Sequence, residues 1–394
     1  MKFVKVAVGA ALALAMVGCG GQDAAPSADG AASAPAAKAV AKVYEPKALD
    51  GTAIAVQYRK NTSESLKPVV DAIAASFKNG FTEALAEADG DDDAAKVKKL
   101  YADSGLEGAD VKWALVTAGG VSLAELLSDK VQVPDVAIAV AFDHDIDKIV
   151  AALLATLDED EKNRLVETKV AGLKAWKADD EDAKEAGAEP CFTSLDGKLF
   201  LGATSPALLE RLVALYADGK GGNSAFETLS SGGGAVLRAF VPAFGELLKK
   251  AVESGESDGL AAIDMVIPNG SKILLGFGEV DFAVLADASG VSVKLSVNTA
   301  TDEDANSLRT MLNAYWTSCV ESLKNSDDEE DKLAYSALKD LKLGGEGKTF
   351  TAKLPIPDDL IKKALEEMSE FTGAFVEADD DEDDDEADEA DDKD

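Results

Sequence analysis

The sequence predicts an α+β fold, in which tandem units of strand, helix, hairpin and helix form mixed or antiparallel sheets covered by helices. Three observations predict this class. Short apolar segments with strand character recur, residues with the spacing of an amphipathic helix follow them, and tight-turn signals separate later pairs of strand-like segments. Because hairpins join antiparallel strands, we expect helices on one side of the sheet and not a doubly wound parallel arrangement.

Three apolar segments are the expected first strands of such units: residues 53–58, 137–142 and 235–240. After the second segment, apolar residues follow helical spacing over residues 146–157, so they share one helix face. After the third, nearly the same spacing runs over residues 244–252. The two best copies of the unit lie about 98 residues apart. A last strand at 348–354 and a helix at 358–371 are expected to close the body.

Two hairpins and the helices after them are expected to complete the units. Asp196 and the glycine after it supply a tight turn in the first hairpin, and the second hairpin spans residues 280–299. Ser205, followed by proline, opens the helix after the first hairpin. Thr301, with Asp304 three residues later, caps the helix after the second.

The N-terminal segment has the features of an export signal. Lys2 and Lys5 precede an apolar run of about 12 residues, too short for a membrane span of roughly 20. The run ends in Met16-Val17-Gly18-Cys19, which resembles the lipobox of bacterial lipoproteins, although Met16 stands where leucine is usual. The resemblance implies that residues 1–18 are removed and that Cys19, lipidated with palmitate-type chains, becomes the new N-terminus.

A tether is expected between this anchor and the folded body. Residues 20–43 are small, contain proline and lack apolar periodicity, which predicts a flexible chain with an average reach of roughly 25–30 Å. Gly20, in place of aspartate, resembles lipoproteins that are sorted to the outer membrane. The expected location is therefore the bacterial envelope, facing the periplasm or the cell exterior, with the lipidated N-terminus holding the protein on the membrane.

Acidic residues dominate the chain, and its C-terminus most of all. The formal charge is −35, and residues 377–394 hold 14 acids and one lysine. Such a charge repels phosphate backbones, so nucleic acid is not an expected partner. The tail is expected to be disordered. It could act as a spacer, hold divalent cations or attract a basic protein.

These features divide the chain into five parts. Residues 1–18 are the signal peptide, 19–46 the lipidated tether, 47–230 the first α+β half, 231–374 the second half and 375–394 the acidic tail. The stretch from about residue 190 to 310, with a hairpin before a helix opened by Ser-Pro, resembles domain families of unknown function in secreted bacterial proteins. That resemblance implies no activity.

No pattern predicts a catalytic centre or a bound cofactor. His144, the only histidine, lies among aspartates at a helix start, where we expect Asp145 to cap the helix. The alternatives are a weak cation site and catalysis by His144. The Gly-x-Ser-x-Gly match at 255–259 follows a helix and not a strand, and the Gly-Lys-Thr sequence at 347–349 lacks the earlier glycine of a phosphate loop.

Carboxylates and cysteines leave further alternatives open. Three acidic clusters could bind calcium, although none fits an EF-hand loop and solvated loops are the simpler interpretation: residues 89–93, 143–147 and 179–182. Cys191 and Cys319 could form a disulfide in an oxidising compartment, worth roughly 4–5 kcal/mol of stability. Cys319 also lies on an apolar helical stripe, which would suit a buried free thiol.

The leading functional hypothesis is a membrane-anchored envelope lipoprotein whose body is a non-enzymatic binding or structural module. One alternative is a cation-dependent hydrolase, which needs a cleft where carboxylates from different segments converge. A second alternative is a carrier of an apolar ligand, which needs an apolar cavity of several hundred cubic ångströms between sheet and helices.

Overall fold

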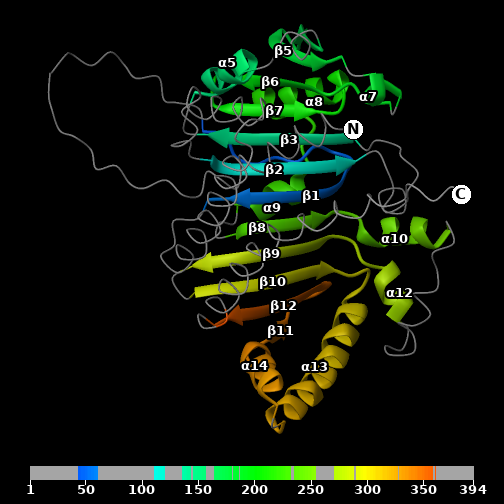
Figure 1. Ribbon diagram of the computed structural model, residues 1–394. Coiled ribbons are helices and arrows are strands. Elements are labelled where there is room, and N and C mark those ends of the chain that lie inside the picture. The colour runs from blue at the N-terminus through cyan, green and yellow to red at the C-terminus, as the bar shows by residue number, and fades with distance from the viewer. Residues whose placement is uncertain are drawn as a thin grey trace, which may run out of the picture.

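Figure 1 shows the computed structural model of the chain. The structure describes residues 43–60, 111–119, 135–142, 145–156, 164–179, 181–185, 187–231, 235–253, 270–287, 290–326, 328–357 and 360. The expected signal peptide, most of the tether and the acidic tail lie outside these residues, as do the glycine-rich match at 255–259 and the acidic cluster at 89–93.

The described strands form one twelve-stranded sheet, and every pairing between neighbours is antiparallel. Their order is β11-β12-β10-β9-β8-β1-β2-β3-β7-β6-β5-β4, a continuous stack in Figure 1. The strands are β1 (Thr52–Arg59), β2 (Val111–Gly119), β3 (Asp135–Phe142), β4 (Leu165–Val170), β5 (Leu173–Ala178), β6 (Cys191–Leu195), β7 (Leu199–Ala203), β8 (Ala235–Val241), β9 (Val280–Asp287), β10 (Gly290–Asn298), β11 (Lys342–Gly344) and β12 (Thr349–Ile356).

Eight helices lie in the described ranges, and some of them begin at capping residues that the sequence predicts. They are α5 (Ile146–Thr156), α7 (Glu181–Glu185), α8 (Pro206–Asp218), α9 (Ser224–Ser231), α10 (Phe244–Glu253), α12 (Gly270–Leu275), α13 (Asp302–Lys324) and α14 (Glu329–Leu338). Ser205 Oγ accepts a hydrogen bond from the backbone N–H of Leu208 at the start of α8. Thr301 Oγ1 accepts one from the backbone N–H of Asp304 at the start of α13. Both expected caps are confirmed.

The α+β class is confirmed, and so are most of the expected elements. The three apolar segments are β1, β3 and β8, the amphipathic segments are α5 and α10, and the two hairpins are β6–β7 and β9–β10. In the first hairpin Asp196 and Gly197 have φ of 54° and 62°, a left-handed conformation that glycine adopts freely and aspartate tolerates. The closing strand is β12, and Leu360 is the described residue of the helix expected after it.

The sheet continues across the expected boundary between the two halves. β1 pairs with β8, so strands on either side of the expected boundary at residue 230 belong to one sheet. The repeat of the unit is not confirmed either. β3 lies beside the second strand of its hairpin, β7, whereas β8 lies beside the first strand of its hairpin, β9. The units share local sequence patterns, but their strands occupy different places in the sheet.

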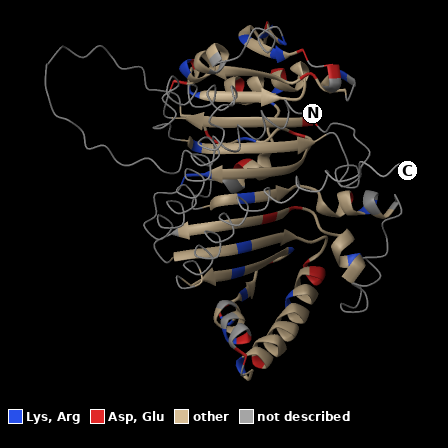
Figure 2. Cartoon of the chain, in the orientation of Figure 1, with Lys and Arg blue, Asp and Glu red and all other residues tan. Residues whose placement is uncertain are grey.

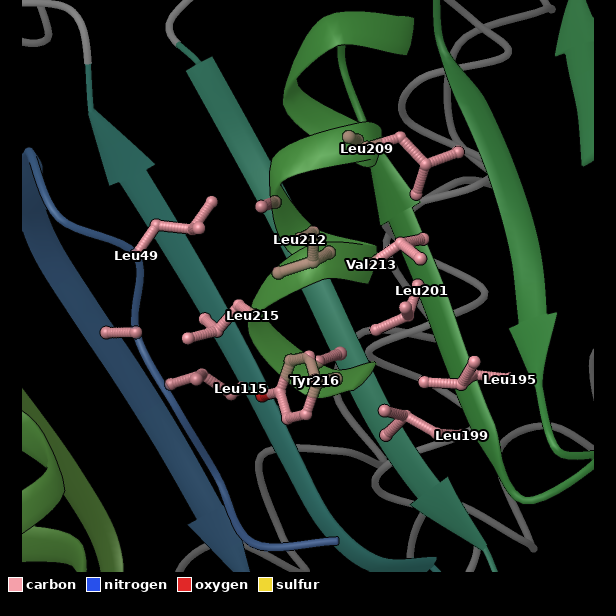
Figure 3. Packing of buried hydrophobic residues seen from close by; sticks show 14 of the residues in the cluster. Leu49, Leu115, Leu195, Leu199, Leu201, Leu209, Leu212, Val213, Leu215 and Tyr216 are labelled. Carbon is pink, nitrogen blue, oxygen red and sulfur yellow. The ribbon is translucent and has the colours of Figure 1, made fainter. Parts of the chain in front are cut away.

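Helices cover both faces of the sheet, which corrects the expectation of helices on one side. We call the face that carries Leu115 and Leu201 the α8 face, because α8 packs on it through Leu209, Leu212 and other apolar side chains in Figure 3. The opposite face, which carries Val140, is the α5 face, because α5 packs there. Strand residues alternate between the two faces, so β1, β2, β3, β5, β6 and β7 each contribute to both cores, whereas β4 contributes Val170 to the α8 face.

The packed body begins earlier than the expected tether boundary. Tyr44 is buried in the core of the α8 face, and its backbone C=O accepts a hydrogen bond of 2.8 Å from Trp113 Nε1. The backbone N–H of Lys47 donates to Tyr216 Oη of α8 at 3.0 Å. The chain is therefore fixed against the sheet from residue 44, inside the segment that we expected to be a tether up to residue 46.

Candidate functional site

The start of α5 confirms the structural interpretation of Asp145. Its Oδ1 accepts a hydrogen bond of 3.1 Å from the backbone N–H of Asp147, so Asp145 caps the helix. Asp147 lies in the first turn, where its charge complements the helix dipole, and it accepts a hydrogen bond from Ser194 of β6. His144 lies outside the described residues. The two described aspartates of this cluster therefore have structural partners.

The other acidic and glycine patterns give no metal or phosphate site within the described ranges. Asp179 pairs with Lys184, which donates a hydrogen bond to it and holds the pKa of the carboxyl below its usual value. The Gly-Lys-Thr sequence leads into β12, a strand and not the helix that a phosphate loop requires. No group of three or more His, Cys, Asp or Glu side chains lies together in the part of the chain that the structure describes.

The disulfide between Cys191 and Cys319 does not form in the structure, where both thiols are free. Cys191 belongs to β6, whereas Cys319 belongs to α13, which packs on β11 and β12. Seven strands separate β6 from β12, and this corresponds to about 38 Å at a spacing of about 4.8 Å per strand. A disulfide needs Cα atoms within about 7 Å, so a bridge within the chain is incompatible with this sheet.

The two thiols should differ in reactivity. Burial raises the pKa of the Cys191 thiol to about 12, whereas the Cys319 side chain is half-buried. We expect iodoacetamide at pH 8 to alkylate Cys319 and to leave Cys191 unmodified until denaturant is added, because the thiolate is the reactive species. Peptide mass spectrometry measures both sites, and Cys191→Ser should leave labelling of Cys319 unchanged. A peptide that links the two cysteines without reductant would contradict the strand order.

Two surface hollows accompany the described elements, and neither is an enclosed cavity between sheet and helices. One, of about 570 Å³, is wide open to solvent and is lined by residues of α13: Glu303, Asn306, Ser307, Thr310, Met311 and Ala314. The other, of about 230 Å³, lies where β1, β2 and β3 meet α8, and its walls include Asp50, Asp135 and Arg211. It joins carboxylates from separate segments, but a cation there would also face the Arg211 guanidinium. The hollow therefore suits a small polar molecule better than a divalent cation.

A row of polar and charged residues crosses the α8 face from β1 to β11. We call it the polar row. Five members pair in register, with Ala283 of β9 between Arg238 and Lys294, and Asp281 lies two residues from Ala283 on the same face: Gln57, Arg238, Asp281, Lys294, Lys353 and Lys342. Figure 2 shows basic residues on β8, β10 and β12 and an acidic one on β9 along this line. The hydrophobic pattern of each strand predicts a buried face, so every charge in the row is an exception that needs a physical account.

An ion pair lies at the buried end of the polar row. Arg238 Nε lies 2.9 Å from Asp281 Oδ1, and the two side chains are only 7% and 6% exposed. Burial raises the pKa of Asp281 above its usual value, and the positive charge of Arg238 opposes this effect only in part. Gln57, paired in register with Arg238, has no hydrogen-bond partner for its Oε1 among the described residues. This end of the row is a desolvated polar cluster inside the sheet.

The α5 face carries an exposed apolar patch over the same central strands. Val56 of β1, Leu237 of β8 and Phe282 of β9 are 40%, 42% and 40% exposed, and we call them the apolar patch. In register, Ala239 lies between Val56 and Phe282, so the three side chains belong to adjacent strands on one face. The described contacts of α8 and α13 with the sheet lie elsewhere, mainly on strands nearer its two ends. Contiguous exposed apolar side chains of this kind are typical of interaction surfaces.

Neither the polar row nor the apolar patch was predicted from the sequence. One signal for the row was available: Arg238 and Asp281 are isolated charges inside the apolar segments AVLRAFV and VDFAVLAD. The patch had no local signal, because an exposed apolar residue and a buried one look alike in a strand. The cysteines and the acidic clusters that the sequence suggested as candidate sites lie outside both surfaces.

Comparisons with known proteins do not assign the chain to a family. No family model matches the sequence, and no curated protein matches it. Among solved structures, crystal forms I, III and IV of TP0453 align with TM-scores of 0.32, 0.34 and 0.36 at 8–9% identity. Each alignment covers 81% of this chain and 93–95% of that one. Similarity at this level does not establish a shared function.

A search of the helices for a membrane span gave a negative result. Across the described ranges, no helix combines the length and apolar character needed to cross a bilayer.

Proposed function

We propose that this chain is a lipid-anchored protein of the bacterial cell envelope and that its body is a non-enzymatic module that binds another protein through the apolar patch. The observation that carries the binding role is the patch itself, formed by Val56, Leu237 and Phe282 on three adjacent strands. A broad, flat sheet face suits a protein surface better than a small ligand, which needs a concave pocket.

The chemistry of the partner follows from the patch and from the charge of the chain. The patch would be matched by exposed apolar side chains on the partner. The formal charge of −35 would favour basic residues around that apolar centre, because complementary potentials speed the encounter and exclude acidic competitors. The proposed partner is therefore a protein with an apolar contact surface bordered by lysine and arginine.

The anchor follows from the N-terminal sequence and from where the packed body begins. Cys19 lies 25 residues before Tyr44, the first residue fixed in the core. The chain between them, rich in alanine and glycine, would separate the body from the membrane by roughly 25–30 Å. At that separation both faces of the sheet would be accessible to a partner in the same membrane or next to it.

Replacing Cys19 with serine should abolish membrane attachment. Acyl chains contribute about 0.8 kcal/mol per buried methylene, and the protein would lose all of that contribution. In a bacterial host, we expect an alkyne analogue of palmitate to label the wild type and the matched control Cys191→Ser, but not Cys19→Ser. After cell fractionation, we expect the wild type in the membrane fraction and Cys19→Ser in the soluble fraction. If Cys19→Ser were labelled as strongly as the wild type, the proposed lipid anchor at Cys19 would be wrong.

Removing the apolar patch should weaken binding to the partner without unfolding the sheet. The double variant Leu237→Thr/Phe282→Thr keeps two residues with strong β-propensity but removes most of the exposed apolar area. Val166→Thr is the matched control, because Val166 is 45% exposed on β4, near the other end of the sheet. We expect a photoreactive amino acid at position 237 or 282, but not at 166, to crosslink the same protein in cells.

The crosslinked protein, once purified, supplies the quantitative test. Its affinity should fall at least about tenfold for the double variant, equivalent to about 1.4 kcal/mol, and stay unchanged for Val166→Thr. If sedimentation showed instead that the patch joins two copies of this chain, the partner proposal would be wrong. Equal loss of affinity in the double variant and in Val166→Thr would also exclude the patch as the interface.

A further inference from the structure

Three lysines form the other end of the polar row and lie directly opposite one another; Lys342 is exposed, and Lys294 and Lys353 are half-buried. Lys294 of β10 pairs in register with Lys353 of β12, which in turn pairs with Lys342 of β11. We call these three residues the lysine row. Like charges opposite each other across strands are destabilising by some tenths of a kcal/mol. Their side chains project from the α8 face, so the repulsion is concentrated on one small area of the sheet.

The described surroundings do not neutralise the lysine row. None of the three lysines forms an ion pair with a described residue. Asp281, the carboxylate that faces Lys294 electrostatically, is already paired with Arg238 at 2.9 Å. A local excess of positive charge therefore stands on a chain whose formal charge is −35. Such an area attracts anionic groups, and the chain itself carries a dense source of them.

The acidic tail starts close to the lysine row along the chain. Lys353 lies in β12, three residues before that strand ends at Ile356, and the tail begins about 20 residues later, at Glu377. The helix expected at 358–371 would be about 21 Å long at 1.5 Å per residue, and residues 372–376 would add up to about 17 Å. The lysine row extends over only three strands, about 10 Å at a spacing of about 4.8 Å. The tail can therefore reach all three lysines of its own chain.

We propose that the acidic tail, residues 377–394, docks on the lysine row of the same chain. The tail holds 14 acids and one lysine, so its carboxylates can be set against the three ammonium groups in many alternative registers. A link of this length gives an effective concentration of the tail in the millimolar range, which compensates for the weakness of each exposed contact. The basic partner that the tail sequence suggests is then part of the same molecule.

Docking of the tail has a consequence for external ligands. An anionic molecule or an acidic protein segment reaches the lysine row only by displacing the tail, so the tail acts as a built-in competitor. Because none of the three lysines is buried, the strength of their contacts with the tail falls as salt shortens the screening length, which is about 8 Å at physiological ionic strength. The tail covers the α8 face, whereas the apolar patch lies on the α5 face, so this inference does not depend on the proposed partner.

Lysine acylation, followed by peptide mass spectrometry, tests the docking on the full chain. Three forms are compared at low salt: wild type, a form without residues 377–394, and a full-length form in which every acid of the tail is replaced by its amide. We expect deletion and neutralisation alike to raise the acylation rates of Lys294, Lys353 and Lys342 by about threefold or more. Lys169, an exposed residue of β4 near the far end of the sheet, is the internal control and should not change.

Two further measurements complete the test. Adding 0.5 M salt should raise the rates of wild type to those of the neutral-tail form, and a peptide of residues 377–394 should restore protection to the truncated form. Equal rates at the lysine row with and without the tail would overturn the proposal. So would a rise of the same size at Lys169, because the tail would then act on the whole surface and not on this row.

Discussion

Replacing Arg238 with methionine should lower the free energy of unfolding by about 3–5 kcal/mol, the usual range when one partner of a buried ion pair is removed. Methionine fills a similar volume, so the main change is electrostatic. Asp281 would remain 6% exposed on the α8 face without its guanidinium partner at 2.9 Å. Urea denaturation followed by circular dichroism measures the change, and an unchanged m-value would show that the unfolded state is not affected.

The double variant Arg238→Met/Asp281→Leu is the matched control for that prediction. It removes both charges, and well-packed apolar replacements of buried ion pairs are often neutral or stabilising. We therefore expect the double variant to recover most of the stability lost in Arg238→Met. If it were as unstable as the single variant, the loss would come from packing of the arginine stem and not from an uncompensated carboxylate.

The elements that the sequence predicted are those with purely local causes. The helix α8 follows from Ser205 as its cap and from the apolar side chains that recur at helical spacing in Figure 3. The turn between β6 and β7 follows from Asp196 and Gly197, whose positive φ values need those residue types. In each case the information lies within a few residues, so the pattern predicts the structure without knowledge of the fold.

The strand order could not be predicted, because it depends on contacts between distant residues. Ala55 lies opposite Phe240, and nothing near either residue specifies that pairing. β2 was missed altogether, although its burial pattern on both faces shows a central strand. A continuous apolar run such as VKWALVTAG does not alternate with period two, so its periodicity does not distinguish a buried strand from a helix. The choice between a disulfide and free thiols at Cys191 and Cys319 also stayed open for this reason, because it depends on which strands are neighbours.

The polar row and the apolar patch could not be predicted from local sequence patterns either. Lys294, Lys353 and Lys342 are ordinary strand lysines when each is taken alone, and they form a row only because β10, β12 and β11 are neighbours in register. Val56 and Phe282 become a patch only because β8 lies between their strands. Surfaces that depend on the fold can therefore be predicted only once the strand order is known. A covalent anchor such as Cys19, by contrast, is predicted from four consecutive residues.

Replacing Phe240 with alanine is the second change for which we expect a large effect, about 3–5 kcal/mol of lost stability. Phe240 belongs to β8 and is fully buried against Phe226 of α9, with ring centroids 5.8 Å apart. It also lies opposite Ala55 of β1, so it joins the second part of the chain to the core under α8. A cavity at this place would weaken the junction at the centre of the sheet.

Phe282→Ala is the matched control, because Phe282 lies on the neighbouring strand β9 but points to the other face and is 40% exposed. We expect it to cost under about 1 kcal/mol, since much of its ring is already in water. Urea denaturation should give one cooperative transition for the wild type and for both variants, at a lower midpoint for Phe240→Ala. Two separate transitions in the wild type would contradict a single sheet continuous through β1 and β8. Because the core of the α8 face includes Phe240, the loss of that ring should destabilise the strands on both sides of the junction together.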